Sequence, residues 1–326
     1  MEQAIKDKIE SALEESFEWT KIEKGLNSVY RIYSGKKKFI VKVHTNENLE
    51  SENFKAEPLI YDAIQEKTDV PSPKVIHESL DDEEFSFYVM ELIEGENPGP
   101  RRKNLEMETL EDLIFEYGKI LGEIHREIGF ESYGELEGST DGPTVRDSSE
   151  NWRDELSEIF HVYRDIVEDE WDNPPKMEIP DNLGCIPERP KPSLIHVDNR
   201  LDNLLVEDNR ITGFIDWSFT RTGHNEYDLI RAEYLLIDYD LRFLSETKKE
   251  RLKESLFGGY REEIDLDKDS GFKARRQLYR YAPVFWLAAG FQSWGQDLEK
   301  DAYQEMLQLI IESLKEEKPK NLPFNQ

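Results

Sequence analysis

The segment from Leu194 to Trp217 constrains this chain more than any other part of it. It reads His-x-Asp-x-x-x-x-Asn, then an apolar run, a polar turn, and a second apolar run that ends in Ile-Asp-Trp. Two short apolar runs on either side of a polar turn predict a β-hairpin. The hairpin would bring Asn203, before its first strand, close to Asp216, after its second strand. The fold must therefore place the loop carboxylate of Asp198 near an amide and a second carboxylate.

These three side chains suit a phosphoryl-transfer site. Such a transfer needs a carboxylate that orients the attacking hydroxyl or accepts its proton, and hard oxygen ligands that hold Mg²⁺ against the phosphates. Asp198 suits the first role, and Asn203 and Asp216 suit the second. Arg200, two residues after the carboxylate, could neutralise charge on the transferring phosphoryl group. Each residue alone is common in turns and caps, so the prediction depends on their joint spacing.

This segment resembles the catalytic loop and metal-binding segment of the aminoglycoside phosphotransferase, or choline kinase-like, family, a branch of the protein-kinase-like fold. The resemblance implies a two-lobed α+β protein. Residues 1–93 would form an N-lobe with an antiparallel sheet and one helix. Residues 94–326 would form a mainly helical C-lobe with the catalytic hairpin, in which Ser193–Trp217 is the one β-rich interruption. From the spacing of apolar residues, a first helix is expected over about Ile5–Glu15, and further helices are expected over Ser51–Ile64, Leu105–Gly129, Glu150–Glu170, Tyr227–Leu244, Arg276–Trp294 and Ala302–Lys315.

The N-terminal part of the chain has the residue order that the resemblance requires. A kinase-like site needs a strand lysine that contacts the α- and β-phosphates and is held by a helix carboxylate. Lys42 on the third strand and Glu57 in the next helix stand in these places. The turn with Gly25, Asn27 and Ser28 stands where the phosphate-covering loop should be.

Three further segments resemble parts of the same family. The strand Phe87–Gly95 resembles the interlobe hinge, which implies that the carbonyl of Glu91 and the N–H of Ile93 pair with the adenine edge. The stretch Gly118–His125 resembles a helix of the family, and its His125 is expected to be a packing residue. Asp228 is expected to brace the catalytic loop through hydrogen bonds.

The predicted function is transfer of the γ-phosphate of ATP to a hydroxyl of a small molecule, with ATP and Mg²⁺ as cofactors. Val197 stands where the family usually has glycine, and the loop Asn199–Asp202 differs from that of the resistance enzymes. Both departures argue against an antibiotic substrate. The acceptor, the choice of ATP over GTP and the oligomeric state stay open.

Two alternatives to a small-molecule kinase stay open. A protein Ser/Thr kinase would carry Asp-Phe-Gly and Ala-Pro-Glu segments, and Ile215-Asp216-Trp217 stands in place of the first. A non-catalytic nucleotide-binding regulatory module would show the loss of a catalytic residue, and none is lost.

The acceptor is expected to bind between the segment 150–171 and the helices that follow Asp228. Acidic and aromatic side chains there would suit a cationic or sugar-like acceptor. For any one of these residues alone, packing in the core or exposure on a solvated face is a more common role than acceptor binding. The candidates are Trp152, Glu155, Glu233, Tyr234, Asp238, Trp286 and Trp294.

The net charge of this chain excludes several partners. It has 42 Lys and Arg against 71 Asp and Glu, which gives −29 over 326 residues. Nucleic acid and anionic membrane surfaces would be repelled, and no apolar run approaches the roughly 18 residues of a membrane span. The single cysteine, Cys185, suits a reducing cytoplasm. Such acidity indicates either a salt-rich cytoplasm or a cationic ligand, and the spread of the acidic residues along the whole chain favours the first. Salt weakens the repulsion between them, because the screening length falls from ~10 Å at 0.1 M to ~3 Å at 1 M.

Overall fold

The N-terminal part of the protein is an antiparallel sheet with one helix on each face. The computed structural model describes residues 2–24, 27–45, 51–81, 85–139, 142–180, 183–266, 271–295 and 298–318. The sheet has the strand order β1-β2-β3-β5-β4, and all its neighbours are antiparallel. The predicted antiparallel sheet is therefore confirmed. Its elements are α1 (Glu2–Leu13), β1 (Glu18–Lys24), β2 (Ser28–Ser34), β3 (Lys37–Thr45), α2 (Ser51–Lys67), β4 (Val75–Ser79) and β5 (Phe85–Glu91).

Side chains of β3 alternate between the two faces of this sheet, as they do in any strand. Val41 and Val43 are buried in a small apolar cluster with Ile5 and Ile9 of α1. Lys42, which lies between the two valines, points to the opposite face and contacts α2. The alternation of β3 thus turns the lysine toward the rest of the molecule.

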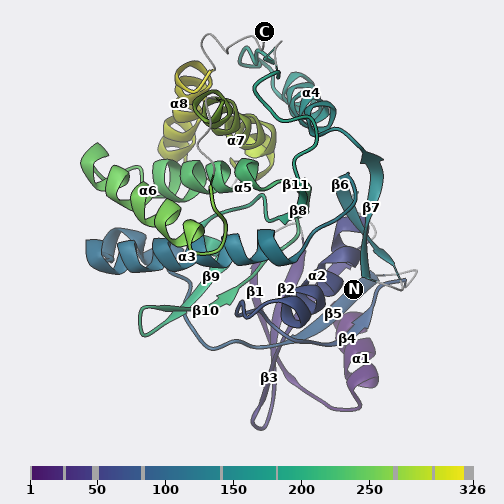
Figure 1. Ribbon diagram of the computed structural model, residues 1–326. Coiled ribbons are helices and arrows are strands. Elements are labelled where there is room, and N and C mark those ends of the chain that lie inside the picture. Colours follow the sequence, from purple (N-terminus) through teal and green to yellow (C-terminus); the bar gives the residue numbers. More distant parts are fainter. Residues whose placement is uncertain are drawn as a thin grey trace.

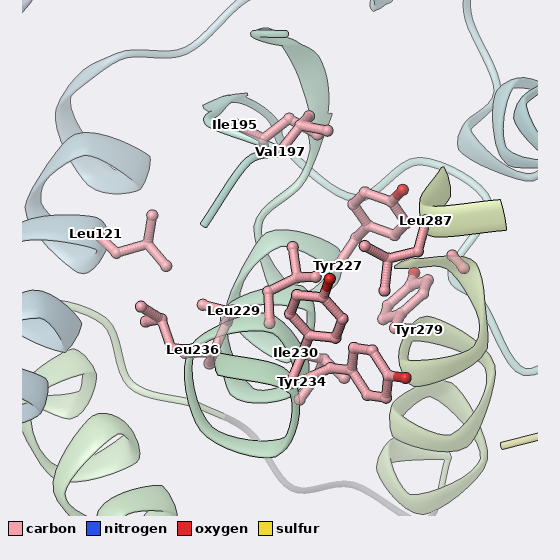
Figure 2. Packing of buried hydrophobic residues seen from close by; sticks show 14 of the residues in the cluster. Leu121, Ile195, Val197, Tyr227, Leu229, Ile230, Tyr234, Leu236, Tyr279 and Leu287 are labelled. Carbon is pink, nitrogen blue, oxygen red and sulfur yellow. The ribbon is translucent and has the colours of Figure 1, made fainter. Parts of the chain in front are cut away.

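The C-terminal part is mainly helical, so the α+β class is confirmed. Figure 1 shows the sheet and α1 at one end of the molecule and helices α5 to α8 at the other. Buried residues of α2 and β5 belong to one apolar cluster with those of the C-terminal helices. Figure 2 shows part of this cluster, where Leu121, Leu229 and Tyr279 come from three different helices. The division at residue 93 stays a prediction. The helices are α3 (Met107–Glu127), α4 (Trp152–Glu170), α5 (Asn225–Ala232), α6 (Glu246–Arg261), α7 (Phe272–Trp294) and α8 (Lys300–Glu316).

Helices α3 and α6 touch through their backbones. A Cβ atom at Gly118 would lie 2.2 Å from the carbonyl oxygen of Leu256, and one at Gly259 would lie 1.9 Å from that of Phe115. Only glycine permits so close an approach. Helix α6 itself was not predicted, because its charged sequence hides the apolar spacing on which the other helices were recognised.

A second sheet corrects the prediction that Ser193–Trp217 is the one β-rich interruption of the C-terminal part. Its strand order is β7-β6-β11-β8. The hairpin of β6 and β7 packs against α2, and a contact so distant in sequence leaves no mark on the local pattern. The strands are β6 (Tyr133–Ser139), β7 (Gly142–Ser149), β8 (Pro192–Ile195) and β11 (Arg221–His224).

The helix predicted over Tyr227–Leu244 is two segments. Helix α5 ends at Ala232, and the chain continues as a π-helix, η3 (Glu233–Asp240). Such π-helical turns are rare and often occur near functional sites. The sequence did not predict this one, because the spacing of its apolar residues resembles that of an α-helix. In the described part of the chain, none of the helices has the length and apolar character needed to cross a membrane.

Candidate active site

The predicted hairpin is present and closes at its base. Strands β9 (Leu204–Glu207) and β10 (Arg210–Phe214) are antiparallel neighbours. The N–H of Ile215 donates a hydrogen bond of 3.0 Å to the carbonyl oxygen of Asn203. This bond holds Asn203 and the segment that leads to Asp216 side by side, as the sequence predicts.

Lys42 connects three segments of the chain. Its Nζ lies 2.7 and 2.9 Å from the carboxylate oxygens of Glu57, and the side chains are 8% and 0% exposed. The same Nζ lies 3.0 Å from Oδ1 of Asp216 and 2.7 Å from Oγ of Ser218. Burial alone would raise the pKa of Asp216, but Lys42 and Ser218 hold that pKa at about 2. Asp216 is therefore ionised at neutral pH.

Sequence reasoning missed two residues that position Asp216. The hydroxyl of Ser218 donates to Oδ1 of Asp216 at 2.7 Å, and the hydroxyl of Tyr61 accepts the N–H of Asp216 at 3.0 Å. Ser218 follows Asp216 by two residues, which is a signal that could have been used. Tyr61 has no such signal, although it lies one helical turn after Glu57, on the same face of α2.

Asn203 holds the catalytic candidate Asp198. Its Nδ2 donates to the carbonyl oxygen of Asp198 at 2.7 Å and to Oδ2 at 3.0 Å. The other carboxylate oxygen, Oδ1, is buried and has no hydrogen-bond partner among the described residues. Burial raises the pKa of Asp198, and the charge of Arg200 opposes this effect. Oδ1 is thus an acceptor that no residue in the described ranges uses.

Asp228 braces the catalytic loop, as expected. Its carboxylate accepts the N–H of His196 at 2.8 Å, the N–H of Val197 at 3.0 Å and Nδ2 of Asn199 at 2.6 Å. Nε2 of the buried His125 lies 3.3 Å from Oδ2 of Asp228. His125 is therefore packed in the interior, as expected, and it also contacts Asp228 through its ring nitrogen.

Val197 has a backbone conformation that a β-branched residue rarely adopts. Its φ is 70°, and its side chain is almost fully buried. Glycine, which is usual at this position in the family that the chain resembles, would adopt this angle without strain. Asp228 binds the N–H of Val197, and Nε of Arg231 donates to its carbonyl oxygen. Figure 2 shows Val197 next to Ile195 near α5. The neighbours thus fix the residue that precedes Asp198.

Arg200 faces two carboxylates. Its Nη2 donates to Oδ2 of Asp202 at 2.8 Å and lies 3.5 Å from Oδ1 of Asp240. Its guanidinium also lies 5.8 Å from the ring centre of Tyr239. Burial raises the pKa of Asp240 to about 6. The role of Arg200 toward a phosphoryl group stays a prediction.

Asn27 and Ser28, which precede and begin β2, lie near Lys42. Ser28 pairs with Val43 in the ladder of β2 and β3, and Oδ1 of Asn27 lies 2.9 Å from Nδ1 of His44. Gly25 lies outside the described residues. The phosphate contacts predicted for this turn stay predictions.

The hinge candidates lie where β5 ends. The N–H of Glu91 donates to the carbonyl oxygen of Lys74 at 2.9 Å, which leaves the carbonyl of Glu91 as the group predicted to face adenine. Ile93 packs against the catalytic hairpin, since a Cβ at Gly213 would lie 3.3 Å from its Cδ1. The adenine contacts of Glu91 and Ile93 stay predictions.

The residues predicted to bind the acceptor are mostly engaged within the protein. Trp152 is fully buried and its Nε1 donates to the hydroxyl of Tyr279 at 3.1 Å. Tyr234 is buried, and Trp286 is partly exposed. The side chain of Trp294 lies outside the described part. The acidic candidates form ion pairs: Glu155 with Arg221, Glu233 with Arg276 and Arg280, and Asp238 with Arg280 and Lys253.

Asn203 and Asp216 each keep one oxygen of the kind that binds Mg²⁺. Because Nδ2 of Asn203 is bonded to Asp198, the amide oxygen is the atom left for a cation. Oδ1 of Asp216 is bonded to Lys42 and Ser218, which leaves Oδ2. Proteins commonly hold Mg²⁺ with one or two such oxygens together with substrate phosphates.

An antiparallel sheet with a buried lysine, a helix with its glutamate, and a hairpin with polar residues at its base together define a kinase-like fold. Residues 18–264 match the model of the phosphotransferase enzyme family, which covers most of the chain. The protein belongs to that family.

Several solved structures share this fold. A thermostable mutant of aminoglycoside phosphotransferase APH(4)-Ia, in ternary complex with ADP and hygromycin B, is 14% identical with a TM-score of 0.63, over 95% of this chain and 98% of that one. A microcompartment-associated aminopropanol kinase is 18% identical with a TM-score of 0.60, over 96% of both chains. A putative fructosamine-3-kinase from Haemophilus somnus 129PT is 15% identical with a TM-score of 0.59, over 95% of this chain and 96% of that one. No curated protein matches the sequence.

Proposed function

We propose that the protein transfers the γ-phosphoryl group of ATP to a hydroxyl group of a small molecule. The observation that carries this proposal is the 3.0 Å contact between Lys42 and Asp216. It joins the lysine expected at the α- and β-phosphates to the carboxylate expected at the metal. Asn203, hydrogen-bonded to Asp198, extends the same cluster to the catalytic carboxylate.

Each residue has one task in this proposal. Lys42 binds the α- and β-phosphates, and Asn203 and Asp216 hold Mg²⁺, which supplies charge neutralisation at the β- and γ-phosphates. Oδ1 of Asp198 accepts a hydrogen bond from the acceptor hydroxyl and then its proton. The hydroxyl oxygen forms a bond to the γ-phosphorus while the bond to the bridging oxygen breaks, and ADP leaves with that electron pair.

The choice of ATP and of a small acceptor is supported by the family and by its structural neighbours. One neighbour was solved with ADP and hygromycin B, and the names of two others specify aminopropanol and fructosamine as acceptors. Because their identity to this chain is low, none of these acceptors is assigned to it. The proposal includes a cytoplasmic location, because the reaction consumes ATP and the single cysteine has no possible internal disulfide partner.

An ADP-release screen on the full chain tests the proposal. Hydroxylated amines, sugars, hydroxy acids and peptides containing serine or threonine are supplied with MgATP at low and at molar KCl. Release that depends on a small acceptor and is lost in Asp198→Asn supports the proposal. Phosphorylation of peptides without any transfer to small molecules would instead favour a protein kinase. Binding of MgATP without transfer to any compound would favour a regulatory module.

A further inference from the structure

Arg231 is a fully buried cation without an ion pair in the described part of the chain. Its relative exposure is 0%. Nε donates to the carbonyl oxygen of Val197, and Nη1 lies 3.4 Å from the hydroxyl of Tyr227. Nη2 is buried and has no hydrogen-bond partner among the described residues. Buried charges are normally paired, because removal of a charge from water is costly.

Aromatic rings surround the guanidinium of Arg231. Its carbon lies 4.8 Å from the ring centre of Trp286 and 5.9 Å from that of Tyr227. Trp286 is partly exposed and meets the ring of Phe219 edge-on at 5.7 Å. Cation–π contacts stabilise the charge, but they do not satisfy the N–H groups of Nη2.

Two more buried donors, next to each other at the start of β11, have no hydrogen-bond partner in the described ranges. They are Oγ1 of Thr220 and Nε of Arg221. Arg221 pairs with Ile195 in the ladder of β11 and β8, two residues before Val197. We call Thr220, Arg221 and Arg231 the buried donor cluster. Unsatisfied buried polar groups are rare in native proteins, so three of them near one loop call for an explanation.

The buried donor cluster lies beside the catalytic carboxylate. Arg231 holds the carbonyl oxygen of Val197, and the next residue is Asp198. Arg231 and the partly exposed Trp286, whose ring lies over its guanidinium, are therefore close to the place where an acceptor hydroxyl would meet Oδ1 of Asp198.

The carboxylates of this region are already neutralised within the protein. An acid without a cation or N–H partner would favour a cationic acceptor, but each buried or nearly buried acid of α4, α5 and η3 has such a partner. They are Glu155 with Arg221, Glu226 with Arg275, Asp228 with His125 and the loop N–H groups, Glu233 with Arg276, Asp238 with Arg280, and Asp240 with Arg200.

We infer that the acceptor is an alcohol that also carries an oxyanion, a carboxylate or a phosphate, which binds Nη2 of Arg231. This inference rests on the proposed function and assigns its substrate class. The oxyanion enters beside Trp286, which must turn aside because Nη2 is not exposed. A planar guanidinium suits either oxyanion through paired N–H donors.

Matched acceptors test the inference. Homoserine is compared with 3-aminopropan-1-ol, glucuronate with xylose, and glycerol 3-phosphate with propane-1,2-diol, because the second member of each pair lacks only the oxyanion group. The wild-type protein should use the anionic member of at least one pair with a kcat/KM about tenfold higher or more, as expected for hydrogen bonds to a charged group. The first two pairs report on carboxylate and the third on phosphate. Equal use of both members, or preference for the amine or neutral members, overturns the inference.

Two variants separate recognition of the acceptor from bracing of the loop. Arg231→Lys keeps the charge and one donor for Val197 but lacks Nη2. It should raise KM for the anionic acceptor about tenfold while kcat changes by less than about threefold. The matched control is Arg276→Lys, which changes an arginine paired with Glu233 and should keep the preference. A fall of kcat for both members of a pair, without a change in preference, would mean that Arg231 is only a brace and would overturn the inference.

A binding measurement makes the inference independent of turnover. Sodium malonate and sodium phosphate, at constant ionic strength against chloride, should raise the melting temperature of the wild type more than that of Arg231→Lys. Equal protection of both proteins overturns the inference. Protection by MgATP is measured in parallel and reports on the proposed function alone. If MgATP raises the melting temperature but the anions do not, only the inference about the acceptor is overturned. If the anions raise the melting temperature of the wild type more than that of Arg231→Lys, but no acceptor is phosphorylated, only the proposed function is overturned.

Discussion

Nζ of Lys42 lies 3.0 Å from Oδ1 of Asp216, although 174 positions separate the two residues in the sequence. The same ammonium is bonded to both carboxylate oxygens of Glu57. One buried cation thus ties the N-terminal sheet and helix α2 to the end of the catalytic hairpin. Stability and nucleotide binding should therefore depend on the same side chain.

Replacement of Lys42 by methionine should destabilise the protein. It leaves the carboxylate of Glu57, which is 0% exposed, without its cation. Removal of one partner of a buried pair costs about 3–5 kcal/mol. Urea unfolding followed by circular dichroism measures the change. The control is Lys38→Met, because Lys38 and Glu94 are 47% and 64% exposed and their pair should contribute less than about 1 kcal/mol. Equal losses in both variants would contradict this role of Lys42.

Replacement of Asp198 by asparagine should lower kcat by about 10² to 10⁴, as for loss of a general base. The amide keeps the size of the side chain and an oxygen that Asn203 can bind. Affinity for MgATP, measured by calorimetry, should stay close to the wild-type value. Asp208→Asn, in the turn of the catalytic hairpin, is the control and should keep full activity. Wild-type turnover by the Asp198 variant would rule out the proposed base.

Replacement of Asp216 by asparagine should weaken MgATP more than metal-free ATP. Asp216 has φ of 63°, and asparagine tolerates this left-handed region better than most residues. The backbone should therefore stay in place while one carboxylate ligand is lost. Titration with ATP in the presence of Mg²⁺ and of EDTA measures both affinities. A loss of the same size under both conditions would argue against metal binding by Asp216.

Asp240 should make the protein less stable as the pH rises from 4 to 6. Burial raises its pKa from 3.8 to about 6, so in this range the folded protein keeps a proton that the unfolded chain has lost. The contribution of Asp240 to the free energy of unfolding is thus fully present below pH 4 and falls by about 3 kcal/mol by pH 7. Asp240→Asn removes this dependence, and urea unfolding at pH 4, 5, 6 and 7 measures the difference. Parallel curves for the variant and the wild type would contradict the buried state of this carboxyl.

The net charge of −29 should make stability depend on salt. Repulsion between the many carboxylates weakens as salt screens it. The melting temperature is therefore expected to rise with KCl into the molar range. Sucrose at equal osmolality is the control, since it stabilises without screening charge. A melting temperature that falls steadily with KCl would end the interpretation of this composition as adaptation to salt.

Much of the geometry of the candidate site could be predicted from the sequence because its signals are local. The loop from His196 to Asn203 and the hairpin that ends at Asp216 are continuous in the chain, and their spacing determines which groups meet. Lys42 and Glu57 follow in the order that a strand and the next helix impose. The brace by Asp228 was likewise expected from one short segment, and its hydrogen bonds are present.

Only the tertiary structure decided which charges of the C-terminal part are already paired. The sequence predicted a cationic or sugar-like acceptor from the number of acids near α4 and η3, but it does not show that Glu155 meets Arg221 or that Glu233 meets Arg276 and Arg280. Nor does it show that Arg231 is buried without an ion pair among the described residues. Pairing and burial depend on contacts between helices and strands that are distant in the chain, and the local spacing of residue types carries no record of them.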